Sequence, residues 1–366
     1  MSQRVLFLLH IPPPVHGSSM VGKWIKGSDL VNKTFSCRYI NLLASDSVSQ
    51  SGVLSIRKII GFIGLWWKLF ISLIRHRPDL CYIALTSTGI AFYRDALLVC
   101  TIRLFGIRRI FHLHNKGVKG ASTGKLKRWL YKSTFKGTDV ILLSDFLYSD
   151  IENFVRRDMV HICHNGIPDS GKYAGLKDLE SGVPKILFLS NLMKSKGIFV
   201  LLDALNKLKN RNIEFSCIVV GREGDVTELQ FQQKLSTLGL NGSVKYLGGV
   251  YGEEKYELMN SVDVFTLPTF FECFPLVLLE AMEHGLPVIS TREGGIPDIV
   301  EDGVNGYLVA REDSGELAEK LEKMILDPQL RTRMGSAGRE KFERHFKLDI
   351  FERRLTDILT EVINRH

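Results

Sequence analysis

Short apolar segments alternate with longer amphipathic segments along most of the chain, and this alternation limits the fold more than any other feature. The short apolar runs fit buried strands, and apolar residues spaced three and four apart fit helices. Because successive strand–helix units are joined by right-handed crossovers, they build parallel sheets with helices on both faces. The expected strands are 5–10, 80–85, 109–114, 140–143 and 160–163 in the first half, and 185–189, 215–220, 244–247, 264–267 and 287–290 in the second.

Residues 169–184 lack this periodicity and predict a linker between two parts of the chain. A length of 366 residues is enough for two domains of ordinary size. The expected fold class is therefore α/β, with two doubly wound, Rossmann-like parallel-sheet domains facing across a cleft. We expect the first domain over residues 1–175, the second over 183–345, and a C-terminal helix, 346–366, that packs back on the first domain.

Positive charge is concentrated in the first half of the chain. Residues 1–175 carry 24 Lys and Arg against 10 Asp and Glu, whereas the remainder carries 24 against 30. A basic half favours an anionic partner, either a membrane surface or nucleic acid, although an ordinary solvated basic face is the alternative. The chain lacks aromatic-rich sheet and helix-turn-helix signals, so we expect no nucleic-acid partner.

The apolar helix expected over residues 59–74 bears on the membrane alternative. It is short and is interrupted by Lys68, so it does not fit a transmembrane helix. Either it packs on the sheet, or part of it lies in the membrane interface, with Trp66 and Trp67 at its centre and basic residues on anionic lipid.

The six cysteines indicate a reducing compartment. None are spaced as C-x-x-C, and several lie in apolar segments, so they fit buried free thiols. The apolar start at residues 5–9 is too short for a signal peptide. We therefore expect a cytoplasmic protein, peripheral on the inner face of the membrane.

Two loops that follow expected strands of the first half favour ligand contacts. Gly17 lies between the first strand and the next helix, where a missing side chain lets backbone approach a ligand, although such a loop is also found as a simple turn. His112 and His114 share one face of a strand, but no further zinc ligands are suggested nearby, so we expect no metal site. His114 could instead hydrogen-bond a substrate hydroxyl. The segment GASTGK at residues 120–125 fails the P-loop spacing.

Residues 264–309 carry the strongest functional pattern, two glutamates with seven residues between them. Glu272 precedes a helix that we expect to begin at Pro275, and Glu280 lies one turn into it. Free N–H groups near Phe274, Leu276 and Val277 favour an anion there. At about 1.5 Å rise per residue, the two carboxylates should lie roughly 10 Å apart.

A ligand with hydroxyl groups at each end and an anion in the middle fits this layout, and a nucleotide sugar is such a ligand. The alternative is that both glutamates stabilise the helix dipole and remain solvated.

The motifs together resemble the retaining glycosyltransferases of family 4, which have the GT-B fold. The similarity runs over nearly the whole chain and is strongest over residues 186–346. The matching segments are HGSS at 16–19, HLHN at 112–115, LLSDF at 142–146, HNGI at 164–167, Lys196–Gly197, GREGD at 221–225, VKYLGGV at 244–250, LPTFFECFPLVLLEAMEHGLPVIST at 267–291, GGIPDIVEDGVNGYLV at 294–309 and MGSAGREKFERHF at 334–346.

The resemblance implies a role for each candidate residue. Glu272 would contact the donor sugar, Glu280 the ribose, and Lys196 the diphosphate, where a cation stabilises the charge of the leaving nucleotide. His114 would touch the transferred sugar or the acceptor, and no nucleophile is implied. Further donor contacts would come from Gly17, Asn191, Arg222, Phe274, Pro275, Leu276 and Val277.

One departure concerns Ser190 and Asn191, which stand where the family usually has Gly and Arg. An amide offers hydrogen bonds but no charge, so Arg222 and Lys194 are the candidates to compensate. The chain also lacks Asp-x-Asp, so no metal-bridged diphosphate is indicated.

The resemblance implies a metal-independent retaining glycosyltransferase of the hexosyltransferase type, with a C-terminal nucleotide-sugar-binding domain and an N-terminal acceptor-side domain. The donor would be a nucleotide sugar such as a UDP- or GDP-sugar, with no separate cofactor. The acceptor would be lipid-linked or a polysaccharide precursor. The alternative is a non-catalytic nucleotide-sugar-binding subunit of a heteromeric transferase.

Overall fold

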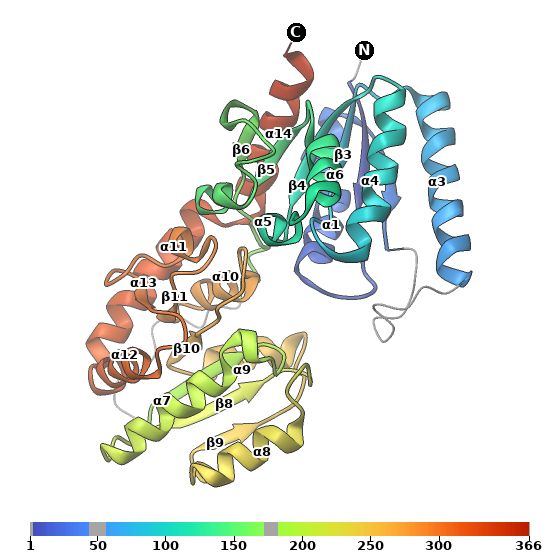
Figure 1. Ribbon diagram of the computed structural model, residues 1–366. Helices are drawn as coiled ribbons and strands as arrows, with labels where there is room; N and C mark the ends of the chain where they lie inside the picture. The colour runs from blue at the N-terminus through green and yellow to red at the C-terminus, as the bar shows by residue number, and fades with distance from the viewer. Residues whose placement is uncertain (1–2, 44–55, 172–181, 366) are drawn as a thin grey trace. The chain divides into compact units, whose positions relative to one another are not determined.

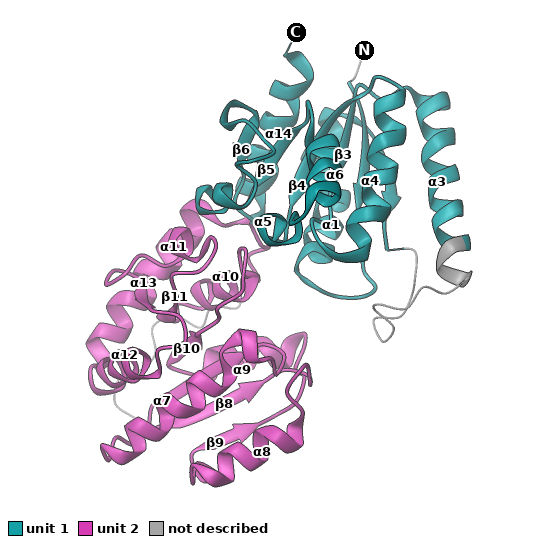
Figure 2. Cartoon of the chain, viewed as in Figure 1, with its two compact units in different colours: residues 1–165, 348–366 teal, residues 166–347 magenta. Residues whose placement is uncertain are grey.

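Each half of the chain folds around its own six-stranded parallel sheet (Figure 1). The computed structural model describes residues 3–43, 56–171 and 182–365. Unit 1 comprises residues 1–165 and 348–366, and unit 2 comprises residues 166–347 (Figure 2). The expectation of two doubly wound parallel sheets is confirmed.

The sheet of unit 1 has the order β2-β1-β3-β4-β5-β6, and its four central strands are almost completely buried. Burial on both faces explains why these strands are nearly continuous apolar runs rather than alternating ones. The strands are β1 (Arg4–Leu9), β2 (Ser36–Asn41), β3 (Leu80–Ile83), β4 (Arg108–Leu113), β5 (Asp139–Leu142) and β6 (Val160–Ile162). The helices are α1 (Gly17–Gly27), α2 (Asp29–Thr34), α3 (Ile56–His76), α4 (Gly89–Leu104), α5 (Val118–Ala121), α6 (Lys125–Phe135) and α14 (Leu348–Asn364), with 3₁₀ turns η2 (Asp145–Asp150) and η3 (Arg157–Met159).

The sheet of unit 2 has the order β12-β11-β10-β7-β8-β9. Its first strand, β7, therefore lies between β10 and β8, where the direction of the winding reverses. The strands are β7 (Lys185–Leu189), β8 (Ser216–Val220), β9 (Val244–Tyr246), β10 (Val264–Leu267), β11 (Val288–Thr291) and β12 (Gly306–Val309). The helices are α7 (Ile198–Asn210), α8 (Glu228–Thr237), α9 (Glu253–Ser261), α10 (Leu276–Glu283), α11 (Ile296–Ile299), α12 (Ser314–Leu326) and α13 (Pro328–His345), with the 3₁₀ turn η4 (Lys194–Lys196).

The helix expected over residues 59–74 is α3, which packs on its neighbour α4 (Figure 1). The indole N–H of Trp66 donates a hydrogen bond to the Thr101 hydroxyl of α4 at 2.9 Å. Leu65, Leu69 and Leu73 form its buried face. No helix in the described ranges is long and apolar enough to cross a membrane.

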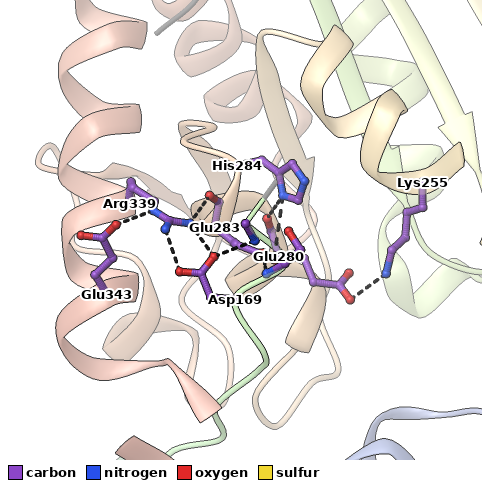
Figure 3. Close-up of polar contacts among 9 residues, drawn as sticks. Asp169, Lys255, Glu280, Glu283, His284, Arg339 and Glu343 are labelled. Atoms are coloured by element: carbon purple, nitrogen blue, oxygen red, sulfur yellow. Dashed lines mark hydrogen bonds and ion pairs between the residues drawn. The ribbon is translucent and has the colours of Figure 1, made fainter. Parts of the chain in front are cut away.

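The segment that enters unit 2 is held by a polar cluster (Figure 3). Arg339 donates to the Asp169 carboxylate at 2.8 Å and to the Glu283 backbone oxygen at 2.7 Å. The Ser170 N–H donates to the Glu283 carboxylate at 2.5 Å. Residues 169–171, expected to belong to a linker, are therefore bound to unit 2. The predicted end of the first domain, residue 175, lies outside the described residues.

The last helix returns to unit 1. Phe351, Leu355, Leu359 and Val362 form the buried face of α14, and the helix contacts α2. The Arg108 guanidinium of β4 donates to the backbone oxygens of Val362 and Ile363, the latter at 3.1 Å. The chain thus crosses between the units twice.

We predict that Phe351→Ala destabilises unit 1 by about 3–5 kcal/mol, because a completely buried aromatic ring leaves a cavity. Urea unfolding followed by tryptophan fluorescence tests this, since all four tryptophans lie within residues 1–165. Arg353→Ala, on the exposed side of the same helix, should change the free energy of unfolding by no more than about 0.5 kcal/mol. Equal effects of the two substitutions would contradict the packing of α14 on unit 1.

Candidate active site

The predicted site residues of unit 2 gather where three parallel strands end. The loops after β7, β8 and β10 carry Lys196, Arg222 and Glu272, and these strands are neighbours in the order β10-β7-β8. Ligands of open α/β sheets bind at the carboxyl ends of the strands, where the strand order reverses. Nine of the eleven predicted residues belong to unit 2, whereas His114 and Gly17 belong to unit 1.

The loops after β7 and β10 are in direct contact. Gly197 has φ +78°, and a Cβ atom there would lie 2.0 Å from the Pro268 backbone oxygen. The Thr269 hydroxyl and the Phe270 N–H both donate to the Ser195 backbone oxygen, at 3.0 and 2.9 Å. Only glycine fits this approach, because any side chain would push the two loops apart.

This approach brings together the two residues expected to be central to the chemistry. The Lys196 ammonium forms an ion pair with the Glu272 carboxylate, and each side chain is 20% exposed. A pair that is partly shielded from water keeps more of its electrostatic attraction than a surface pair. Lys196 and Glu272 can therefore act on one ligand.

Glu280 also pairs with a lysine, one that sequence reasoning missed. Lys255 of α9 lies 2.7 Å from the Glu280 carboxylate (Figure 3), and the two side chains are 18% and 23% exposed. The two residues are 25 positions apart, and α9 is weakly amphipathic, so no sequence pattern indicates this contact. Both glutamates of the pattern are thus ion-paired, while their separation of roughly 10 Å stays a prediction.

The start of α10 differs by one residue from the expectation. Pro275 is the N-cap residue, not the first helical residue, and the helix begins at Leu276. A proline has φ near −65° in either position, so the sequence pattern does not separate them. No side chain caps this helix start, which leaves the first-turn amides of Leu276 and Val277 for an anion. The Phe274 side chain is buried against Phe346, with the ring centroids 5.9 Å apart.

A glycine pair supports the loop that carries Glu272. A Cβ atom at Gly294, which has φ +52°, would lie 2.3 Å from the Glu272 backbone oxygen. The Gly295 N–H donates to the Cys273 backbone oxygen at 2.6 Å. These glycines were part of a matching motif, but only the structure shows what they contact.

Asn191 contacts the loop that carries Arg222. Its side-chain oxygen accepts a hydrogen bond from the Arg222 N–H at 3.3 Å. The Arg222 guanidinium lies over the ring of Tyr251, 5.1 Å from the centroid. Asn191 therefore positions the loop after β8, while the charge near it comes from an exposed arginine.

In unit 1, His114 follows β4 and leaves a polar atom open. Its Nδ1 is buried and has no hydrogen-bond partner among the described residues. The centroids of its ring and of the His112 ring are 4.1 Å apart. Burial, followed by repulsion from His112 and His16, holds the pKa of His114 well below its ordinary value. A neutral imidazole with an unused nitrogen can hydrogen-bond a ligand hydroxyl.

The residues near Gly17 include a second neutral histidine. Gly17 is exposed and begins α1 after the N-cap residue His16. His10, at the end of β1, contacts the hydroxyls of Thr86 at 3.3 Å and Ser18 at 3.4 Å. Burial, with repulsion from Arg94 and the neighbouring histidines, lowers the pKa of His10 to about 3. Sequence reasoning missed His10, because a single histidine at a strand end carries no pattern.

No group of three or more His, Cys, Asp or Glu side chains within the described ranges is placed to hold a metal ion. The positive charges beside Glu272 and Glu280 come from lysines. The arrangement offers cations and backbone N–H groups to an anion, with carboxylates on either side for hydroxyl groups.

Comparison with known proteins finds a family match over part of the chain. Residues 177–341 match the family described as "Glycosyl transferases group 1". D-inositol 3-phosphate glycosyltransferase of Corynebacterium jeikeium is 34% identical over 178 residues, covering 46% of this chain and 42% of that protein. Amylovoran biosynthesis glycosyltransferase AmsK of Erwinia amylovora is 29% identical over 208 residues, covering 55% of this chain and 51% of that protein. The matched part is therefore about half the length of these relatives.

Solved structures share the fold over the whole chain. HepE of Anabaena, crystallised with UDP, has a TM-score of 0.74 at 20% identity, with 98% of this chain and 100% of that chain covered. WaaG, a glycosyltransferase involved in lipopolysaccharide biosynthesis, has a TM-score of 0.69 at 18% identity, with 99% and 100% covered. Both have the two-sheet architecture described above.

We predict that unit 1 loses stability as the pH falls below about 6.5. The unfolded chain then protonates His10, whose folded pKa is about 3, so stability is present above pH 6.5 and is lost between pH 6.5 and 3. Between pH 7.5 and 5.5, one such histidine contributes a loss of about 1.4 kcal/mol.

His10→Gln removes this titration but keeps a polar side chain, so its loss over the same interval should be about 1.4 kcal/mol smaller. Urea unfolding at both pH values, followed by tryptophan fluorescence, measures the difference. The same pH dependence in both proteins would mean that the folded chain protonates His10 as readily as the unfolded chain does between pH 7.5 and 5.5.

Proposed function

We propose that this chain, which resembles the group 1 glycosyltransferases over residues 177–341 and has the GT-B fold, is a retaining glycosyltransferase. It moves a sugar of the hexose type from a nucleotide sugar, such as a UDP- or GDP-sugar, to a lipid-linked or polysaccharide-precursor acceptor. The observation that carries this proposal is the Lys196–Glu272 ion pair beside the uncapped start of α10.

The donor diphosphate lies between Lys196 and the first amides of α10. As the glycosidic bond breaks, the leaving nucleotide gains negative charge, and a fixed cation and aimed N–H groups stabilise it. Because Lys196 supplies positive charge at this point, the proposal needs no metal ion. Arg222, held over Tyr251, supplies further positive charge where Asn191 has none.

The two glutamates bind hydroxyl groups at the ends of the donor, Glu272 those of the sugar and Glu280 those of the ribose. A carboxylate has about four acceptor positions, so one lysine contact leaves room for ligand hydroxyls. Lys196 and Lys255 keep these carboxylates oriented before the ligand arrives. Neutral His114 hydrogen-bonds a hydroxyl of the transferred sugar or of the acceptor. We assign no enzyme nucleophile.

The alternative, a non-catalytic nucleotide-sugar-binding subunit, rests on Asn191 in place of arginine. The Lys196–Glu272 pair supports catalysis, because a cation fixed beside the carboxylate assigned to the sugar can stabilise the leaving nucleotide. Relatives named for amylovoran and capsular polysaccharide biosynthesis support a glycan-precursor acceptor.

We expect the purified chain alone to turn over a nucleotide sugar, and Lys196→Met to lower kcat about 10²-fold or more. A screen of nucleotide sugars for thermal stabilisation identifies the donor first, because a ligand of the folded state raises its stability. Lys207→Met, which removes the same charge from the exposed end of α7, is the matched control and should keep full activity. Donor binding without any turnover by the wild-type chain would support the binding subunit instead.

Substitutions of Glu272 and Glu280 should change different kinetic constants. Glu280→Gln weakens contacts to a part of the donor that does not react, so it should mainly raise the donor KM. Glu272→Gln alters the group beside the reacting sugar, so it should mainly lower kcat and change which sugar is preferred. Kinetics with two nucleotide sugars measures both effects.

Free nucleoside diphosphate is the internal control for this comparison, because it has the ribose but not the sugar. Its affinity should fall in Glu280→Gln and stay near wild type in Glu272→Gln. Equal losses in both variants would refute the assignment of sugar to one glutamate and ribose to the other.

The protein also docks on anionic membrane through α3 and α4, in our proposal, and works at the cytoplasmic face. Its six cysteines are free thiols, as expected for a reducing compartment. Four of them are buried, Cys37 is half-buried and Cys100 is exposed.

The helices α3 and α4 each expose an apolar stripe, and together these form the α3–α4 apolar surface. Its residues, all 45% or more exposed, are Ile60, Ile63, Trp67 and Ile74 on α3, and Ile90, Tyr93, Leu97 and Leu104 on α4.

Basic residues accompany this apolar surface. Lys68, Arg75 and Arg103 lie exposed on the same two helices. Each basic residue near an anionic membrane contributes about 1 kcal/mol, and salt screens it. Apolar side chains flanked by cations are typical of helices that lie in the membrane interface.

We predict that the chain sediments with anionic vesicles at low salt and much less at high salt. The double variant Trp67→Glu/Leu97→Glu should lose this binding, because it places two charges in the apolar surface. Leu229→Glu/Leu326→Glu, at similarly exposed apolar positions of unit 2, is the matched control and should sediment like wild type. Absence of sedimentation at low salt would leave α3 as a helix that only packs on unit 1.

A further inference from the structure

An open cavity of about 440 Å³ lies on unit 1, and none of the residues assigned above line it. It is formed by the end of α5, the start of α6 and the loop after η2. Its lining includes Lys119, Lys125 and Arg128, together with the hydroxyl residues Ser122 and Thr123. The lining contains no acidic residue. Three cationic residues in a lining that has no acidic residue favour an anionic ligand.

The walls of this cavity are held by contacts within unit 1. The Asp150 carboxylate accepts hydrogen bonds from the N–H groups of Gly117, Val118 and Lys119 at 2.8–3.0 Å, which fixes α5 beside the loop after η2. Phe154, from the same loop, packs on Tyr131 of α6 with ring centroids 5.7 Å apart. The cations are therefore presented by a fixed frame, which lowers the cost of binding.

The charges of the cavity are available for a ligand. Lys119 has an exposed ion pair with Glu152 at 3.5 Å, and such pairs are weak. Within the part of the chain that the structure describes, neither Lys125 nor Arg128 forms an ion pair. The helix α6 begins after Gly124 without a side-chain cap and with no acid in its first turn, so its amides add to the positive potential.

The cavity lies at the end of the unit 1 sheet where His114 lies. Lys119 follows His114 by five residues, so their Cα atoms are at most about 18 Å apart. Leu126 and Trp129 of α6 are 78% and 63% exposed beside the cationic residues. An anion with an apolar chain attached would find both kinds of contact here.

We propose that this cavity binds a phosphate or diphosphate group of the acceptor. The assignment of the ligand to the acceptor rests on the transferase function proposed above, whereas binding of a phosphate group does not. An arginine fork and two lysines suit phosphate oxygens, with the hydroxyl of Thr123 as a further donor. The acceptor is therefore a phosphorylated one, with the reacting hydroxyl directed toward His114.

Isothermal titration of the full chain with inorganic pyrophosphate tests the cavity directly. All proteins in this titration carry Lys196→Met, which weakens the diphosphate site of unit 2 and leaves any remaining binding there the same in every variant. Adding Lys125→Gln/Arg128→Gln should weaken binding at least about tenfold, the loss of one charge-assisted contact or more. Lys127→Gln/Lys132→Gln removes the same charge from the same helix outside the cavity and should weaken binding less than about threefold.

Equal weakening by both pairs would overturn the proposal, because diffuse charge alone would then explain the binding. Absence of pyrophosphate binding to the Lys196→Met chain would overturn it as well. Circular dichroism and thermal unfolding of each variant show that the chain is folded during the titration.

A second titration separates the two sources of the phosphate. If monododecyl phosphate binds more tightly than inorganic phosphate, and Trp129→Ser removes this difference in affinity, the acceptor is lipid-linked. Equal affinities indicate a soluble phosphorylated acceptor. Both results support the cavity, provided that Lys125→Gln/Arg128→Gln removes the binding.

The outcomes also separate this inference from the proposed function. If the chain binds pyrophosphate in the cavity but transfers no sugar, the cavity proposal stands and the transferase proposal is wrong. If the chain transfers sugar with the same acceptor KM in wild type and in Lys125→Gln/Arg128→Gln, the transferase proposal stands and the cavity is not the acceptor site.

Discussion

The candidate site depends on a close backbone approach between Gly197 and Pro268. The strands β7 and β10 are parallel neighbours, so the loops that follow them emerge at the same edge of the sheet. Their contact is possible because Gly197 has no Cβ atom and adopts a positive φ. This contact puts Lys196 beside Glu272, and the same loop leads into the start of α10. Cation, carboxylate and helix amides are then fixed before any ligand binds, which is what electrostatic stabilisation of a leaving group requires.

Partly buried ionisable side chains are stabilised differently in the two units. In unit 2, each glutamate of the pattern has a lysine beside it, so charges are kept and balanced. In unit 1, the histidines at the strand ends are neutral, because burial lowers the pKa of each below the physiological range. The first arrangement suits an anion with hydroxyls at its ends, and the second suits a hydroxyl that accepts or donates a single hydrogen bond.

Unit 1 also carries the two surfaces that we propose for the membrane and for the acceptor. The α3–α4 apolar surface and the cationic cavity between α5 and α6 lie on the half of the chain with excess positive charge. A phosphorylated lipid would use apolar contacts and cations together, which gives a physical reason for the uneven charge. Each segment that crosses between the units is held by an arginine of the unit that it enters. Arg108 holds α14 on unit 1, and Arg339 holds residues 166–171 on unit 2.

The sequence by itself determined the fold class and most of the central strands, because strands buried on both faces are continuous apolar runs that periodicity detects. It missed the edge strands β2, which is only partly buried, and β12. It also predicts that Glu272 and Glu280, within residues 264–309, bind the donor. Only the tertiary structure decided that Lys196 meets Glu272, that Lys255 meets Glu280, and that the rejected GASTGK segment contributes to a cationic cavity. Each of these contacts joins residues from different strand–helix units, so they form only when the sheet aligns the strand ends, and no local spacing encodes them.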